Sequence, residues 1–170
     1  MLITLETVSL SILFSIALYT DIKWKKIPNI LTLPVALTGI LYNGYSMGIT
    51  AGVLFALKGF AAGVFLLIIP FYLGGTGGGD VKLLGAAGSW LGAVAVINLF
   101  FYAAITGAII ALFIMIRKRG FYFWNLINDI LLSIISDKKT IQKSKEHGML
   151  YSIPFALGFI LYLIRGPLIR

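Results

Sequence analysis

Two aspartates stand where long apolar stretches end, and a pair of carboxylates can do acid–base chemistry. Asp21 follows the first apolar stretch, and Asp80 follows the third, directly after the glycine-rich run 74–79. Two close carboxylates share a proton, so that one member serves as a base and the other as an acid. Each aspartate also has a plain structural interpretation. Asp80 can cap the helix that follows it, and Asp21 can be solvated beside Lys23.

The other ionisable residues offer little competing chemistry. Asp129 falls on the polar face of an amphipathic segment, Asp137 and Glu146 lie in a lysine-rich tract, and Glu6 lies near the N-terminus. The only histidine is His147, and the chain has no cysteine. Disulfides, thiolate zinc sites and a cysteine nucleophile are therefore excluded, and we expect neither a metal site nor a cofactor.

The run before Asp80 is unusual because five of its six residues, 74–79, are glycine. Glycine adopts backbone angles closed to other residues and lets another backbone approach closely. An extended peptide could then lie along Gly77, Gly78 and Gly79, beside the carboxylate. Phosphate binding is a poorer interpretation, because no Gly-Lys-Ser/Thr sequence follows and an aspartate repels phosphate.

The composition indicates a helical membrane protein. Hydrophobic residues make up 59% of the chain and charged residues 12%, and the mean hydropathy is +0.99, whereas soluble domains carry about 25% charged residues. The alternating pattern of a membrane β-barrel is absent. The net charge of +8 comes from Lys and Arg clustered at the ends of apolar stretches. That placement orients a chain in a membrane and does not favour nucleic-acid binding.

We expect an all-α, polytopic membrane protein with about six transmembrane helices in a single membrane-embedded domain, 1–170. The expected spans are 2–20, 30–47, 52–73, 81–91, 93–116 and 148–165. The uncharged stretch 83–116 is too long for one crossing, because its helix would reach about 51 Å against a hydrocarbon core of about 30 Å. The sequence Gly-Ser-Trp-Leu-Gly at 88–92 offers a turn that divides it.

The distribution of basic residues predicts the orientation. An N-terminus outside the cell leaves most Lys and Arg in cytoplasmic segments, as the positive-inside rule requires, and places Asp21 and Asp80 on the cytoplasmic side. The segment near 117–147 is expected to be cytoplasmic or to lie in the membrane interface as an amphipathic helix near anionic lipid. A short re-entrant span is the alternative for this segment.

Together these segments resemble the type IV prepilin peptidase family, which belongs to the GxGD group of membrane aspartic proteases. The matching residues are Gly77-Gly78-Gly79-Asp80, then Val81-Lys82-Leu83-Leu84 and the sequence at 88–92, Asp21 with Ile27-Pro28-Asn29, and Tyr151 to Gly158. The resemblance covers nearly the whole chain in order. It implies that Asp21 and Asp80 are catalytic. It also implies supporting or substrate-binding roles for Gly77, Gly78, Gly79, Lys82, Pro28 and Asn29.

The resemblance further implies an endopeptidase that cleaves the leader peptide of prepilin-like or pseudopilin proteins at the cytoplasmic face of the inner membrane. Larger members carry a methyltransferase segment with paired cysteines. This chain begins with a span and has no cysteine, so it looks like the short, peptidase-only form seen with Flp-type pili. Archaeal preflagellin peptidases share the motifs and stay an alternative. A proton- or ion-coupled transporter is the alternative from another class, and a structural subunit of a secretion machine is a third.

Three further expectations concern packing and anchoring. Gly59-xxx-Gly63 is expected to pack the protein's own helices together. Trp24 and Trp90 are expected at the membrane interface. Lys82 is expected to anchor the topology more than to act in catalysis.

Overall fold

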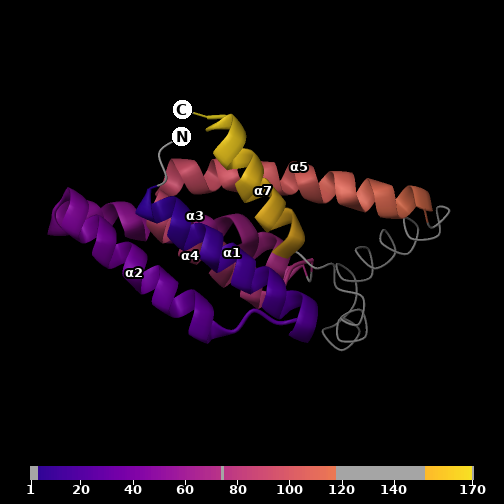
Figure 1. The fold of residues 1–170 in the computed structure, drawn as a ribbon, viewed down its shortest axis with the longest axis horizontal. Helices are drawn as coiled ribbons and strands as arrows, with labels where there is room; N and C mark the ends of the chain where they lie inside the picture. The colour runs from indigo at the N-terminus through magenta and orange to yellow at the C-terminus, as the bar shows by residue number, and fades with distance from the viewer. Residues whose placement is uncertain (1–3, 74, 118–151, 170) are drawn as a thin grey trace.

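The computed structural model describes residues 4–73, 75–117 and 152–169, and the regular structure of these residues is entirely helical (Figure 1). The helices are α1 (Leu5–Trp24), α2 (Asn29–Met47), α3 (Ile49–Tyr72), α4 (Gly78–Leu91), α5 (Ala93–Arg117) and α7 (Ser152–Arg165). The all-α expectation is confirmed. The expected interfacial segment beyond Arg117, and residues 148–151 of the expected last span, lie outside the described residues.

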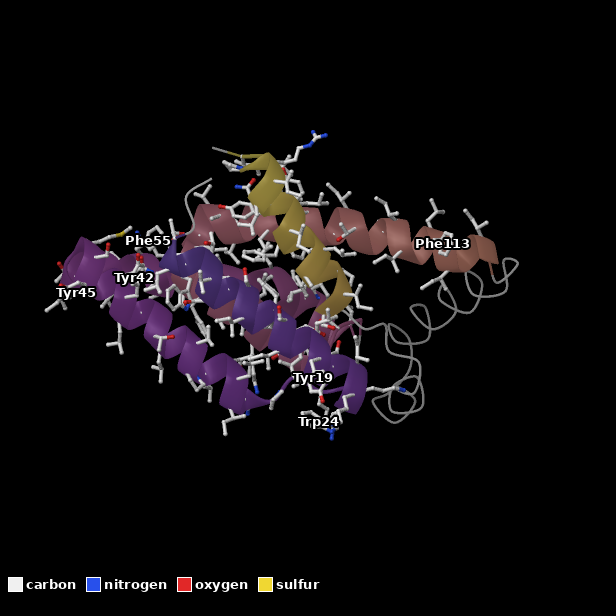
Figure 2. All side chains as sticks on the ribbon, viewed as in Figure 1. Tyr19, Trp24, Tyr42, Tyr45, Phe55 and Phe113 are labelled. Carbon is white, nitrogen blue, oxygen red and sulfur yellow. The ribbon has the colours of Figure 1, made fainter. Side chains whose placement is uncertain are left out.

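Three helices in this part of the chain are long and apolar enough to cross a membrane: α1, α3 and the Ala93–Ile114 part of α5. Helices α4 and α7 have 14 residues each and reach only about 21 Å. Many large apolar side chains face outward; Tyr45 is 94% exposed at the tip of α2 and Phe113 is 63% exposed on α5 (Figure 2). Such a surface suits lipid rather than water.

Two helix ends differ from the expectation. Helix α1 continues past the expected end at residue 20, so Asp21 lies in its last turn and not after it. The helix ends at Trp24. Lys25 caps it in a left-handed conformation (φ 51°) and donates its N–H to the Asp21 carbonyl over 2.8 Å. The turn expected over 88–92 is confined to Gly92 (φ 80°), because α4 stays helical through Leu91.

Helix α4 forms the centre of the bundle and packs against α1, α2, α3 and α5. It lies closest to α3, where a side chain on Gly59 would run into the backbone of Gly88, and one on Gly63 would run into that of Leu84. The expectation that Gly59-xxx-Gly63 packs the protein's own helices is therefore confirmed. Small residues bring the two backbones into contact.

Trp90 was expected at the membrane interface, and this expectation is wrong. Its side chain is 4% exposed, donates Nε1–H to the Val35 carbonyl over 2.8 Å and stacks on Tyr42. Trp24 lies exposed at the end of α1, together with Tyr19 (Figure 2).

Two buried asparagines hydrogen-bond a helix to another part of the chain. Asn43 on α2 donates its amide to the carbonyls of Gly39 (3.1 Å) and Ser89 (3.0 Å), which ties α2 to the end of α4. Asn98 on α5 accepts from the N–H groups of Leu168 and Ile169, each over 2.7 Å. Because buried polar groups are costly when unpaired, these bonds select one arrangement of the helices.

Candidate active site

Both candidate aspartates lie at the same end of the bundle. Asp21 is in the last turn of α1, and Asp80 is in the first turn of α4. The C-terminal end of α1 and the N-terminal end of α7 meet at this end, on the right of the bundle in Figure 1. The fold thus brings together three chain segments that are far apart in sequence.

Asp80 is nearly buried, with 6% of its surface exposed. It is the third residue of α4 and accepts a hydrogen bond at Oδ2 from the N–H of Gly77 over 3.0 Å. Gly77, not Asp80, occupies the capping position. Asp80 therefore reaches back over the start of its helix and satisfies a donor there.

The surroundings of Asp80 favour its protonated form. Burial raises the pKa of Asp80 to about 6; the Gly77 hydrogen bond opposes this shift and the negative charge of Asp21 adds to it. Asp80 lies in the short helix α4, outside the three helices long enough to span a membrane. The two carboxyl groups lie at the same end of the bundle, and a nearby negative charge favours the protonated form of a carboxyl group.

Asp21 has a different partner. Its Oδ2 accepts a hydrogen bond from the backbone N–H of Ser152 over 3.4 Å, at the first residue of α7. The N-terminus of a helix carries a partial positive charge and unpaired N–H donors, both of which stabilise an anion. The site is therefore asymmetric, with Asp80 buried in α4 and Asp21 facing the start of α7.

The segment between α1 and α2 packs against the loop that carries Asp80. A side chain on Gly79 would lie 3.0 Å from the Cβ of Ile27 and 3.4 Å from its backbone N and O. Pro28 caps α2 with extended backbone (φ −73°, ψ 145°). Beside it, Asn29 accepts a hydrogen bond at Oδ1 from Lys82 Nζ over 2.8 Å. The structure thus brings the sequence-predicted supporting residues together.

The glycine loop is less uniform than its sequence suggests. A side chain on Gly78 would make an ordinary contact of 3.4 Å with Phe71, and one on Gly77 would lie 3.1 Å from Asp80 Oδ2. Close backbone approach is thus concentrated at Gly79, where the neighbour is this protein's own Ile27. Whether a substrate backbone also runs along this loop stays a prediction.

Sequence reasoning did not single out Ser152 as a neighbour of Asp21. In the sequence, Ser152 is a polar residue at the start of an apolar stretch. This pattern is common and does not indicate which residue the serine contacts. Nor is a metal centre evident: within residues 4–73, 75–117 and 152–169, no three His, Cys, Asp or Glu side chains cluster.

Comparison with known proteins adds a family context. Residues 8–112 match the type IV leader peptidase family. The chain is 31% identical over 112 residues to a prepilin leader peptidase/N-methyltransferase of Neisseria gonorrhoeae, covering 62% of this chain and 39% of the relative. It is 38% identical over 98 residues to the protein of the same name from Pectobacterium carotovorum, covering 54% and 35%. The matches thus span well under half of either relative. No solved structure matches.

Proposed function

Because the chain belongs to the type IV leader peptidase family, we propose that it is a membrane aspartic endopeptidase that cleaves the leader peptide of prepilin-like proteins. The observation that carries this proposal is the placement of Asp21, in the last turn of α1, and Asp80, in the first turn of α4, at the same end of the bundle. Paired carboxylates that share a proton are suited to peptide hydrolysis.

In the proposed mechanism, the ionised carboxylate takes a proton from water while the water oxygen attacks the scissile carbonyl carbon. The protonated carboxylate gives its proton to the carbonyl oxygen. The tetrahedral intermediate then collapses: one of its hydroxyls returns a proton to the second carboxylate as the C=O bond re-forms, the C–N bond breaks, and the leaving nitrogen receives the proton held by the first carboxylate. The pair finishes with one proton, as it began, and titrates as a unit.

The substrate we propose is a prepilin or pseudopilin of the Flp type, with a short basic leader followed by a hydrophobic helix. Cleavage would occur at the cytoplasmic face of the inner membrane. Both aspartates lie at helix ends and not in mid-span, which supports a scissile bond at the membrane boundary. Lys23, Lys25 and Lys26 at this end favour a cytoplasmic location and contact with anionic lipid.

We propose peptidase activity without N-methyltransferase activity. The names of both relatives include the two activities, and this chain matches only part of each. The resemblance implies paired cysteines in the methyltransferase segment of larger family members, and the given sequence holds no cysteine; the mass of the cleaved product tests the restriction.

A co-expression assay tests the proposed function. A candidate Flp-type prepilin is co-expressed with the wild type, Asp21→Asn, Asp80→Asn or Glu6→Gln, and its N-terminus is analysed by mass spectrometry. Glu6 lies in the first turn of α1, at the opposite end from Asp21, so Glu6→Gln is a matched loss of a carboxylate. We expect unmethylated mature product with the wild type and Glu6→Gln only.

The same assay separates the alternatives. Cleavage of a preflagellin but not of the prepilin would favour the archaeal system. A methylated product would contradict the peptidase-only proposal. If the wild type cleaved neither substrate, the peptidase proposal would be wrong and a transporter would become the better candidate.

A further inference from the structure

Ser152 is the first residue of α7 and is buried, with 1% of its surface exposed. Its backbone N–H donates to Oδ2 of Asp21. Its hydroxyl, although fully buried, finds no hydrogen-bond partner among the residues that the structure describes. The residue thus binds a candidate catalytic carboxylate through its backbone while its side-chain donor is unused.

Several other buried hydroxyls in the bundle are paired. The hydroxyl of Ser89 donates to the Ala86 carbonyl over 2.8 Å, and that of Thr106 donates to carbonyls that include Pro154, over 3.0 Å. Thr32 and Thr76 share the unpaired state of Ser152. Of these three residues, Ser152 alone forms a hydrogen bond, through its backbone N–H, to an aspartate of the site in the described part of the chain. A buried unpaired hydroxyl destabilises the fold, and such groups often mark functional sites.

We propose that Ser152 is a positioning residue that holds Asp21 as the ionised base, with Asp80 as the acid. The inference rests on the proposed function and deepens it. In the resting arrangement the backbone N–H and the N-terminal end of α7 face the carboxylate. When substrate binds, the Ser152 hydroxyl rotates and donates to the same carboxylate. That bond fixes the direction from which Asp21 takes the proton of water.

The charged neighbours of Asp21 are consistent with this division of roles. Asp80, from α4, lies at the same end of the bundle, and the negative charge of Asp21 adds to the burial that raises the pKa of Asp80. On α1, Lys23 directs its ammonium to the Tyr19 hydroxyl over 3.2 Å, and Lys82 on α4 directs its own to Asn29. In the described part of α7, Tyr162 and Arg165 stand toward the far end of the helix. The start of α7 is thus the feature that distinguishes Asp21 from Asp80.

The test compares Ser152→Ala, Ser152→Thr and wild type, all purified in detergent, using a prepilin peptide and measuring kcat, KM, the pH–rate profile and the melting temperature. We expect Ser152→Ala to lower kcat about tenfold to a hundredfold with little change in KM, because a hydrogen bond to a charged group is lost. The two carboxylates titrate as a unit, and a donor to the ionised form favours that form, so the acidic limb of the pH–rate profile should move to higher pH in Ser152→Ala. Ser152→Thr, which keeps the hydroxyl, should restore most of kcat and the original limb.

The melting temperature separates a positioning role from a structural one. Since the hydroxyl has no hydrogen-bond partner among the described residues, Ser152→Ala should melt at the wild-type temperature or above it. The matched control Ser89→Ala removes a paired buried hydroxyl far from the aspartates; it should melt lower and keep its kcat.

Two results would overturn the inference while leaving the proposed function intact. One is a Ser152→Ala enzyme with wild-type kcat and pH profile. The other is a Ser152→Ala enzyme that melts several degrees lower, is not rescued by threonine and keeps the wild-type profile. A wild type that does not cleave the peptide would overturn the proposed function, and this inference with it.

Discussion

Lys82 donates its ammonium Nζ to the side-chain carbonyl Oδ1 of Asn29 over 2.8 Å, although 53 positions separate the two residues. The bond joins the start of α2 to the first turns of α4. It lies beside the second contact between these segments, that of Gly79 with Ile27. The two parts of the chain that carry the family resemblance are therefore packed against each other, and each aspartate belongs to one of them.

The Lys82–Asn29 bond is predicted to align the two segments and not to take part in the chemistry. Lys82→Met and Asn29→Ala should each lower kcat/KM about threefold to tenfold, since one charge-assisted hydrogen bond at an exposed position is lost. The double variant should be no worse than either single one. Lys58→Met, which removes an exposed lysine in α3, is the control and should be neutral. Fully additive losses would show that the two side chains act independently.

Gly79 is predicted to tolerate no side chain. In Gly79→Ala the new methyl group would press on both the side chain and the backbone of Ile27, at 3.0 and 3.4 Å, and would push the Asp80 loop away from the α1–α2 segment. We expect cleavage to fall at least tenfold. Gly75→Ala is the matched control, because its methyl group would meet only the Pro70 carbonyl at 3.4 Å, and it should stay within about threefold of wild type. Equal activity of the two variants would contradict the tight contact at Gly79.

The α3–α4 contact is predicted to limit stability. A methyl group in Gly59→Ala would collide with the backbone of Gly88, and overpacking of this kind costs about 1–3 kcal/mol. In Gly44→Ala the methyl group would lie 3.4 Å from Val53, so this substitution should be neutral or stabilising by up to about 1 kcal/mol, the usual gain from glycine to alanine in a helix. Melting temperatures in detergent test the difference. A Gly59→Ala protein as stable as Gly44→Ala would be evidence against the close approach.

The raised pKa of Asp80 predicts that the free energy of unfolding falls as pH rises. Its pKa is raised from the usual 3.8 to about 6 in the folded protein, so the folded state holds the proton more tightly than the unfolded state does. The stabilisation is complete below about pH 4 and is lost as pH rises through 6; it amounts to about 3 kcal/mol. Asp80→Asn stays neutral throughout.

The Asp80→Asn protein should therefore be more stable than wild type at pH 7–8, and the two should converge near pH 4. Melting curves in detergent from pH 4 to 8 measure this. If the wild type and Asp80→Asn lost stability in parallel between pH 5 and 7, the burial of Asp80 would not control the protonation of its carboxyl group.

The sequence predicts where the helices lie along the chain better than it predicts which side of each helix is buried in the bundle. All six expected helical regions in the described residues are helices, because long apolar stretches bounded by glycine, proline and lysine are a strong signal. The burial of Trp90 could not be predicted, because a helix in a membrane is apolar on its lipid-facing side as well as its buried side. The sequence pattern then does not separate one side from the other.

For the candidate site too, the sequence predicted some features and missed others. Asp21 and Asp80 stand out in the sequence because carboxylates are scarce and their contexts are distinctive, and their catalytic role stays a prediction. The extension of α1 through Asp21 was missed, since the break depends on one left-handed residue, Lys25, which is not a glycine. The pairing of Asp21 with Ser152 joins positions 131 residues apart. Contacts of this length depend on the tertiary fold and leave no local pattern.

The most direct test of the central claim is a comparison of cleavage rates for Asp21→Asn, Asp80→Asn and the double variant on one prepilin substrate. Two carboxylates that act as a unit lose their effect together, so each single variant should be as slow as the double variant and at least a thousandfold slower than wild type. Wild-type-like folding, checked by melting temperature, must accompany the loss. If either single variant retained a rate within about tenfold of wild type, Asp21 and Asp80 would not be the catalytic pair.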